Sequence, residues 1–320
     1  MPRLLIVKTS SLGDVIHNLP IIADIRAHFP DMEIDWVVEE SFADIPRLHP
    51  AVNTVIPVAM RRWRHAIFSK TTWAEIGACK RELKAKSYDL VLDTQGLIKS
   101  AVIGSFAHGA KHGQDKNSAR EPLAACFYQH KHNIPWGEHA VVRNRQLAAL
   151  ALGYAMPDTT PDYGIQAAKP KLPIKFPANY IVGLHGTSRA SKLWSAQNWV
   201  ALGQSLSEQK LALLLPWGNE AEHARAIAIA AGVPQAVVLP KLGLNELAAL
   251  LSKAKAVVGV DTGLAHLAVA LKTPTVAIYT DTEPSLTGLY PGLNSPAINL
   301  GGLSQIPSPR AVVQALNTVI

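Results

Sequence analysis

The stretch that most constrains the fold of this chain is Ala256–His266, with the sequence AVVGVDTGLAH. Its apolar run Ala256–Val260 predicts a strand that is covered on both faces of a sheet. Asp261 and Thr262 are residue types that begin helices, and the apolar spacing beyond them predicts a helix that starts directly at the turn. The first N–H groups of such a helix favour an anion, so the stretch fits either an ordinary capped helix or a phosphate site.

Apolar strands and amphipathic helices alternate in the same way along most of the chain. This alternation predicts an α/β fold with parallel, doubly wound sheets. The predicted strands are 3–8, 34–38, 52–58, 90–93, 180–184, 211–215, 237–239, 256–260 and 275–279. The predicted helices are one that ends near Phe29, then 42–48, 71–86, 140–152, 195–207, 220–231, 244–252 and 264–271, and a last one from Ser308. Pro20 is expected to bend the first helix or to mark its late start.

A proline-rich segment without periodicity, Asp158–Ala178, is the best candidate for a linker between two domains. At 320 residues the chain is long enough for two α/β domains, which we expect to cover residues 1–165 and 166–320. Two doubly wound halves predict a cleft at the carboxyl ends of both sheets. The chain is short after Arg310, so the sequence leaves open whether the last helix returns to the first domain.

The charge of the chain indicates an acidic partner. The net charge is +7, and residues 60–145 hold 15 Lys or Arg and 7 Asp or Glu, which gives a local balance of +8. Such a basic region predicts nucleic acid, an anionic membrane surface, or a phosphorylated or carboxylated substrate as the partner. Scatter over solvated helix faces is the alternative for many of these charges.

Cysteine usage and the lack of a long apolar run favour a cytoplasmic protein. Cys79 and Cys126 are far apart and lack metal-ligand spacing, which favours a reducing compartment. We find no apolar run of the roughly 20 residues that span a bilayer, and the N-terminus is too short and too soon polar for a signal peptide. The histidines lack ligand spacing, so the sequence predicts no metal site.

Three loops of the second half follow predicted strands, at the edge of the sheet where ligands bind. They are His185–Lys192, Pro216–Glu222 and Asp261–His266. The first loop offers Lys192 and a second cation for a diphosphate, and the second offers an indole for stacking and a carboxylate for ribose hydroxyls. Each loop alone fits an ordinary connection, but together they predict a nucleotide-diphosphate site. The chain lacks a Walker A or GxGxxG sequence, so ATPase and NAD hypotheses have no direct support.

The first half offers a carboxylate and a basic cluster. Asp14 follows Gly13 at a strand–loop–helix junction, where it fits either a helix N-cap or a general base facing the cleft. The cluster Arg61–His65 is expected to precede a helix rather than to lie on one. It fits either a solvated loop or a site that binds phosphate or carboxylate groups, to which Lys99 and Arg120 are expected to add.

Six stretches together resemble the lipopolysaccharide heptosyltransferases of glycosyltransferase family 9. The resemblance runs from the first strand to about Pro284, and SLGD and DTGLAH are the motifs shared most widely in the family. The stretches DWVVEE, RRWR and AREPL point to the type I enzymes rather than the type II enzymes. The stretches are 8–14, 35–40, 61–64, 93–97, 119–123 and 260–266.

This resemblance implies a GT-B fold of two Rossmann-like domains, with the acceptor bound by the first domain and ADP-heptose by the second. It implies transfer of L-glycero-D-manno-heptose from ADP-heptose to the Kdo of Kdo2-lipid A, with inversion at the anomeric carbon. It also implies that no metal or other cofactor is needed, because helix N–H groups and a lysine replace the divalent cation. The implied partners are the donor, the acceptor and the anionic inner-membrane surface. The protein is then a peripheral monomer on the cytoplasmic face, without a nucleic-acid partner.

The resemblance also assigns roles to individual residues. Asp14 is the implied base, and Lys192 offsets the charge of departing ADP. The implied donor-binding residues are Thr187, Ser188, Lys192, Glu222, Leu242, Asp261, Thr262, Gly263, Leu264 and His266. The implied acceptor-binding residues are Ser11, Gly13, Arg61, Arg62, Arg64 and Arg120. This chain departs from the common family pattern at His65, Gly186, Ser188 and Leu242.

Three alternatives stay open at the level of the sequence. The nearest is a heptosyltransferase II with a different acceptor, and a second is a nucleotide-sugar epimerase with the same two-domain architecture. A third is a basic nucleotide-binding protein that binds nucleic acid, although its basic segment has few aromatic residues arranged for stacking.

Overall fold

The computed structural model describes residues 1–170 and 175–320, which form two compact units, Met1–Ile165 and Gln166–Ile320. The predicted linker Asp158–Ala178 contains the boundary between these units, and its residues 171–174 lie outside the described residues. The rest of this linker forms no helix or strand in the part that is described.

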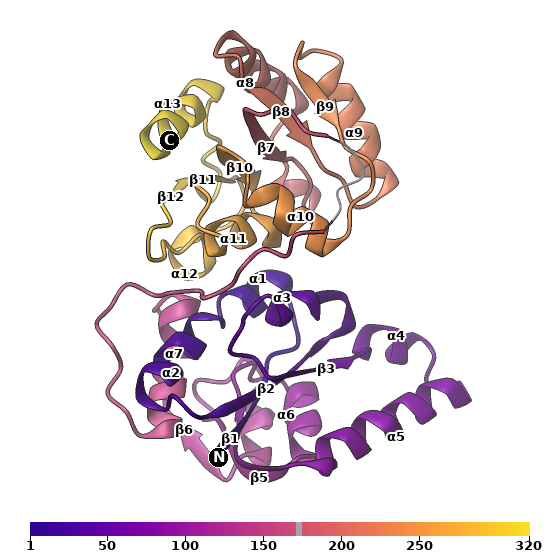
Figure 1. Ribbon diagram of the computed structural model, residues 1–320, viewed down its shortest axis with the longest axis vertical. Helices are drawn as coiled ribbons and strands as arrows, with labels where there is room; N and C mark the ends of the chain where they lie inside the picture. The colour runs from indigo at the N-terminus through magenta and orange to yellow at the C-terminus, as the bar shows by residue number, and fades with distance from the viewer. Residues whose placement is uncertain (171–174) are drawn as a thin grey trace. The chain divides into compact units, whose positions relative to one another are not determined.

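The first unit contains a six-stranded parallel sheet with helices packed against it (Figure 1). Its strand order is β3-β2-β1-β4-β5-β6. The strands are β1 Arg3–Val7, β2 Glu33–Glu39, β3 Thr54–Val58, β4 Ser87–Asp93, β5 His108–Gln114 and β6 His130–His132. The helices are α1 Leu12–Ile16, α2 Pro20–His28, η1 Glu40–Phe42, α3 Asp44–Arg47, α4 Met60–His65, α5 Lys70–Ala85, α6 Ile98–Ser105, η2 Pro122–Phe127 and α7 Ala140–Leu152.

The second unit repeats the same plan. Its strand order, β12-β11-β10-β7-β8-β9, is the first unit's order read from the other edge. The strands are β7 Tyr180–Leu184, β8 Ala212–Leu215, β9 Ala236–Val238, β10 Ala256–Val260, β11 Thr275–Tyr279 and β12 Ala297–Gly301. The helices are η3 Ala190–Lys192, α8 Ala196–Glu208, α9 Glu220–Ala230, α10 Leu244–Leu251, α11 Gly263–Ala270, α12 Pro284–Thr287 and α13 Pro309–Val319.

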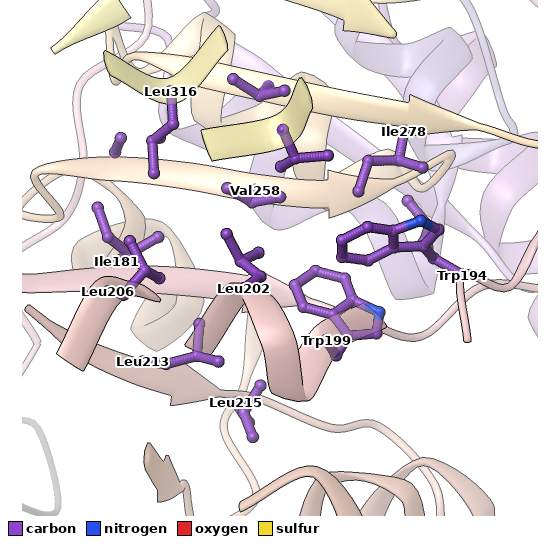
Figure 2. Close-up of a cluster of buried hydrophobic side chains, with 14 of the residues drawn as sticks. Ile181, Trp194, Trp199, Leu202, Leu206, Leu213, Leu215, Val258, Ile278 and Leu316 are labelled. Carbon is purple, nitrogen blue, oxygen red and sulfur yellow. The ribbon is translucent and has the colours of Figure 1, made fainter. Parts of the chain in front are cut away.

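The core of the second unit holds one end of the loop after β7, which carries Lys192. Trp194 and Trp199 are fully buried among the aliphatic residues of this core, and their rings meet edge to face at 5.3 Å (Figure 2). The indole N–H of Trp194 also donates to the carbonyl of Pro307, at 2.9 Å. Because Trp194 follows η3 by two residues, the core fixes the end of the loop that carries Lys192.

The last helix, α13, belongs to the second unit. Val312 and Leu316 lie in the same core as Val258 of β10 and Ile278 of β11 (Figure 2). The apolar stripe of this helix is therefore buried on the sheet of the second unit.

The structure differs from the sequence-based prediction mainly at the sheet edges and in the basic cluster. Arg61–His65 lies on the short helix α4, not in a loop before α5. The sequence-based prediction also misses α6, β5, β6 and β12; β5 and β6 consist mainly of polar residues and glycine, and α6 and β12 are short. Pro20 begins α2 at a position where its missing N–H costs nothing, so the first predicted helix is two helices.

Candidate active site

The loops that carry Asp14 and Asp261 lie where the order of strands reverses. In the first sheet this point lies between β1 and β4, and in the second it lies between β7 and β10. The loops that follow two such strands run to opposite sides, which opens a crevice at the carboxyl end of the sheet. Each unit therefore has its own half-site.

Asp14 lies in the first turn of α1, not at its N-cap. Its Oδ2 accepts hydrogen bonds from the backbone N–H of Ser11 at 2.7 Å and from the Ser11 hydroxyl at 2.9 Å. Ser11 is the N-cap, so the expectation that Asp14 caps the helix is corrected to a carboxylate that reaches back to the cap residue. Among the described residues, both hydrogen bonds to this carboxylate are accepted by Oδ2.

Lys8 is a buried cation directly after β1. Its ammonium donates to the carbonyl of Thr94 at 2.9 Å, in the loop after β4. Burial lowers the pKa of Lys8, and the nearby carboxylates of Asp14 and Asp93 oppose that shift. Lys8 therefore joins the two loops of the reversal point and places a positive charge near Asp14.

The loop after β4 also holds the loop that carries Ser11. The side-chain oxygen of Gln95 accepts from the backbone N–H groups of Thr9 and Ser10, at 3.0 and 3.1 Å. Asp93 in turn accepts from the N–H of Gln95 at 2.8 Å and from the Tyr128 hydroxyl at 2.8 Å. Burial raises the pKa of the Asp93 carboxyl, whereas these hydrogen bonds lower it. A chain of neutral and charged hydrogen bonds therefore fixes the backbone before Asp14.

The arginines of the basic cluster are not equivalent. The guanidinium of Arg62 pairs with Glu40 at 3.1 Å and with Glu75 at 2.8 Å, and these two carboxylates raise its pKa. Its charge is thus already balanced. Arg61 and Arg64 instead line a cavity of about 550 Å³.

This cavity, here called the α4–α5 cavity, has basic, polar and apolar walls. It is lined by Ser10, Met60, Arg61, Trp63, Arg64, His65, Ile67, Thr72, Trp73, Ile76 and Lys99. Arg120 is not among the residues that line it. Its backbone instead packs beside Gly96, next to the loop that positions Asp14.

In the second unit, Asp261 joins its own loop to the loops that follow β7 and β11. The Oδ2 of Asp261 lies 2.6 Å from the ammonium of Lys192 and accepts from the Thr282 hydroxyl at 2.9 Å. The Thr187 hydroxyl donates to the main-chain carbonyl of Asp261 at 2.7 Å. The N-cap of α11 is Thr262, so the expectation that Asp261 caps this helix is wrong. A lysine within bonding distance is a stronger partner for the carboxylate than a helix N–H.

A second cavity, of about 130 Å³, lies beside this ion pair at the carboxyl ends of β7, β8 and β10. It is lined by Leu184, Gly186, Pro216, Trp217, Gly218, Glu222, Leu242, Leu247, Thr262 and Leu264. The Glu222 carboxylate accepts from the N–H of Gly218 at 2.7 Å. A Cβ at Gly186 would lie 2.6 Å from the carboxyl carbon of Glu222, so the glycine makes room for that carboxylate.

The indole of Trp217 forms a fixed wall of this cavity. Its N–H donates to the carbonyl of Leu239 at 2.6 Å, and its ring stacks on His223 at 4.2 Å between centroids. An aromatic ring held in this way, beside a carboxylate and helix N–H groups, is suited to a nucleotide.

Comparisons with known proteins place this chain in a family. A model described as "Glycosyltransferase family 9 (heptosyltransferase)" matches residues 76–311. The chain is 48% identical over 290 residues to lipopolysaccharide heptosyltransferase 1 of Escherichia coli K12, which covers 90% of this chain and 91% of that protein. It is 47% identical to the protein of the same name from Pseudomonas aeruginosa, over 90% and 81% of the two chains. The chain belongs to glycosyltransferase family 9.

Solved structures of family 9 heptosyltransferases have the same fold. The E. coli heptosyltransferase WaaC with ADP is 45% identical, with a TM-score of 0.91 over 99% of this chain and 100% of that chain. E. coli ADP-heptose lipopolysaccharide heptosyltransferase II is 21% identical, with a TM-score of 0.78 over 100% and 98%. The predicted GT-B fold is therefore confirmed, and this protein is a heptosyltransferase.

The structure of this heptosyltransferase brings most of the predicted donor residues together. Thr187, Lys192 and Asp261 are joined by hydrogen bonds, and Glu222, Leu242, Thr262 and Leu264 line the cavity beside them. Gly263 begins α11 and His266 is buried one turn further on. Ser188 is exposed in the loop after β7 and is not among the lining residues.

The predicted acceptor residues are less closely grouped. Ser11 contacts Asp14, and Gly13 lies between them on α1, while Arg61 and Arg64 line the α4–α5 cavity. Arg62 and Arg120 lie outside the lining of this cavity.

Sequence reasoning misses Lys8, Gln95 and Thr282. Lys8 and Gln95 lie in the family-like stretches 8–14 and 93–97, but the resemblance assigns no role to them, and Thr282 lies in a loop where polar residues are ordinary.

Two absences hold for the described part of the chain. Within residues 1–170 and 175–320, no group of three or more His, Cys, Asp or Glu side chains is placed to hold a metal ion. None of the helices in these ranges is long and apolar enough to cross a membrane.

Proposed function

We propose that this heptosyltransferase moves L-glycero-D-manno-heptose from ADP-heptose to a Kdo residue of Kdo2-lipid A. The identity of 47–48% to proteins named lipopolysaccharide heptosyltransferase 1 supports this acceptor, since the identity to a lipooligosaccharide heptosyltransferase 2 is 26%. A solved relative, 43% identical, contains ADP-2-deoxy-2-fluoro heptose, which supports the donor class. Within the structure, the observation that carries the proposal is the Lys192–Asp261 pair at the reversal point of the second sheet.

The second unit binds the donor in this proposal. The base and ribose of ADP occupy the cavity between Trp217 and Leu242, where Glu222 accepts hydrogen bonds from hydroxyl groups. The diphosphate lies at the start of α11, where unpaired N–H groups favour an anion, and Lys192 supplies the positive charge. Asp261 holds the ammonium of Lys192 through its carboxylate, and Thr187 bonds the main-chain carbonyl of Asp261, so these contacts fix Lys192 beside the start of α11.

The first unit supplies the base in this proposal. A hydroxyl oxygen of the acceptor attacks the anomeric carbon of the heptose, and Asp14 takes the proton of that hydroxyl as the new C–O bond forms. The bond between the anomeric carbon and the ADP oxygen breaks with inversion, and ADP leaves with the electron pair. Lys192 opposes the negative charge that develops on ADP, so the step needs no divalent cation.

The acceptor is anionic, and the basic side of the first unit fits it. Arg61 and Arg64 face the α4–α5 cavity with Lys99, where they bind the carboxylates of Kdo or the phosphates of lipid A. Arg62, which the resemblance also assigns to the acceptor, pairs in the structure with Glu40 and Glu75, so the proposal gives Arg61 and Arg64 the leading part. Because the acceptor is a membrane lipid, we also propose that the protein works at the cytoplasmic face of the inner membrane. The family resemblance adds the proposal that it works there as a monomer.

The test is a transfer assay with two acceptors. Purified full-length protein and ADP-heptose are incubated with Kdo2-lipid A or with its monoheptosylated product, and mass spectrometry detects the addition of one heptose. We expect addition to Kdo2-lipid A, with and without EDTA. Turnover on the second acceptor alone would assign a type II enzyme, and isomerisation of the sugar nucleotide without an acceptor would assign an epimerase. Loss of activity in EDTA would contradict the metal-free step.

A further inference from the structure

The connection between α4 and α5 exposes three large apolar side chains, here called the apolar tip: Ile67, Phe68 and Trp73. Their exposed fractions are 50%, 96% and 63%. Figure 1 shows α4 and α5 at the β3 edge of the first sheet. Single exposed apolar residues are common, but a contiguous group marks a surface with a partner.

Hydrogen bonds hold the apolar tip in its exposed conformation. The indole N–H of Trp73 donates to the carbonyl of Ile67 at 2.8 Å, which closes the connection and leaves the ring outside. The indole N–H of Trp63 donates to Glu75 at 2.6 Å and ties α4 to α5. The tip is therefore a preformed surface, which binds without first paying for its own ordering.

Positive charge predominates in the segment that carries the apolar tip. Residues 60–86 contain eight Lys or Arg and two Glu, a balance of +6, although Arg62 and Lys86 also pair with Glu40 and Asp35 outside this segment. Arg64 and Lys70 are exposed on either side of the tip along the chain. Aromatic and aliphatic side chains ringed by Lys and Arg are the composition of surfaces that lie in the headgroup region of anionic membranes.

We propose that the apolar tip docks this protein on an anionic phospholipid bilayer. This inference rests on the proposed function, whose acceptor is a membrane lipid, and it names the surface that meets the membrane. Ile67 and Trp73 also line the α4–α5 cavity, but Phe68 does not. An acyl chain bound in that cavity leaves Phe68, the most exposed side chain of the tip, in water. A bilayer surface covers all three side chains and neutralises the surrounding cations.

The test is partition onto phospholipid vesicles that contain no acceptor. Full-length protein is sedimented with vesicles of phosphatidylglycerol and phosphatidylethanolamine, and with vesicles of phosphatidylcholine. We expect preference for the anionic vesicles, and about tenfold weaker partition for Phe68→Ser. Phe68→Leu keeps an apolar side chain and should bind within about twofold of wild type. The control is Leu150→Ser on α7, which removes an exposed apolar side chain outside the tip (54% exposed, close to the 50% of Ile67) and should leave partition unchanged.

Turnover separates docking from catalysis. With a de-acylated, water-soluble acceptor, Phe68→Ser should retain the wild-type kcat/KM, whereas turnover of vesicle-embedded acceptor should fall with partition. The proposal is overturned if Phe68→Ser partitions like wild type, if wild type binds only vesicles that contain Kdo2-lipid A, or if soluble turnover falls equally. If wild type binds phospholipid vesicles but transfers heptose to no acceptor, the proposed function fails and the docking surface stands.

Discussion

The two units share one order of strands, but hydrogen bonds to an amide and to a main-chain carbonyl join the loops of the first reversal point, whereas an ion pair joins those of the second. In the first unit, the neutral amide of Gln95 holds two backbone N–H groups of the loop before Asp14. In the second unit, the loops are joined by the ion pair of Lys192 and Asp261. Neutral hydrogen bonds fix a geometry whether or not a ligand is present, whereas an ion pair can exchange partners when an anion arrives. The first half-site thus holds the loop before Asp14, the proposed base, in one geometry, whereas the ion pair of the second half-site can respond to an arriving charge.

The largest expected effect breaks the chemistry of the first half-site alone. Asp14→Asn keeps an oxygen that can accept from Ser11 but cannot take a proton, so kcat should fall about 1,000-fold. The Kd for ADP, measured by calorimetry, should stay near wild type because Asp14 is a residue of the other unit. Ser11→Ala serves as control, since it removes one hydrogen bond and leaves the base. Weakened ADP binding with retained kcat would remove Asp14 from its assigned role.

The second prediction compares how the stability of each unit depends on pH, because each unit has a buried histidine with a strongly lowered pKa. Burial lowers the pKa of His49 in the first unit and of His185 in the second to about 4. A histidine in the unfolded chain is protonated as the pH falls through about 6.5, whereas each of these two histidines stays neutral in the folded protein until about pH 4. The contribution of each neutral buried histidine to the free energy of unfolding is therefore complete above about pH 6.5. It declines as the pH falls toward 4, by about 3 kcal/mol for each histidine.

Calorimetric unfolding between pH 7 and pH 4 checks this, with added ADP marking the transition of the second unit. His185→Gln should flatten the pH dependence of the second transition, and His49→Gln that of the first. Equal slopes in wild type and His185→Gln would show that His185 is protonated in the folded unit.

The next prediction removes the ion pair of the second half-site. Lys192→Met takes away the cation and leaves Asp261 facing the diphosphate, so the donor kcat/KM should fall about 100-fold and ADP should bind more weakly. Thr282→Val removes only a neutral hydrogen bond from the same carboxylate and should change kcat/KM about threefold. A loss confined to the acceptor KM would place Lys192 outside the donor site.

The smallest expected effect tests the neutral network of the first half-site. Gln95→Leu leaves two N–H groups without their acceptor, so the loop before Asp14 should loosen and kcat fall about tenfold. Gln95→Glu retains an accepting oxygen and should recover most of this loss. The donor Kd should be unchanged in both variants, and a shift in that constant would mean that the two half-sites are not independent.

The second unit was easier to predict than the first because its central strands are uniformly apolar. Tyr180–Leu184, Ala256–Val260 and Thr275–Tyr279 are buried along their whole length, as their sequences indicate. Strand β5 contains two glycines and two histidines and reads as a loop. Its Gly113 packs against the ring of Tyr128, a contact between distant residues that periodicity does not reveal.

The site was predictable where a motif lies at a strand end and not where partners come from elsewhere. The DTGLAH motif correctly located the start of α11, but it did not show that Asp261 pairs with Lys192 instead of capping the helix. The RRWR motif located a basic surface, but not that Arg62 is held by Glu40 and Glu75. In each case the outcome depends on a partner more than ten residues away, which local pattern does not specify.

The bonds from Thr187 and Lys192 to Asp261 span 74 and 69 residues of sequence. Contacts of such separation form late, because closing long loops costs chain entropy before the contacts reward it. The donor half-site therefore does not exist in any partly folded chain in which β7 and β10 are unpaired, even if α8 and α9 have formed. During refolding, the binding of ADP should consequently recover later than the helical circular dichroism signal. ADP binding can then be used to measure when the pairing of β7 with β10 in the second sheet is complete.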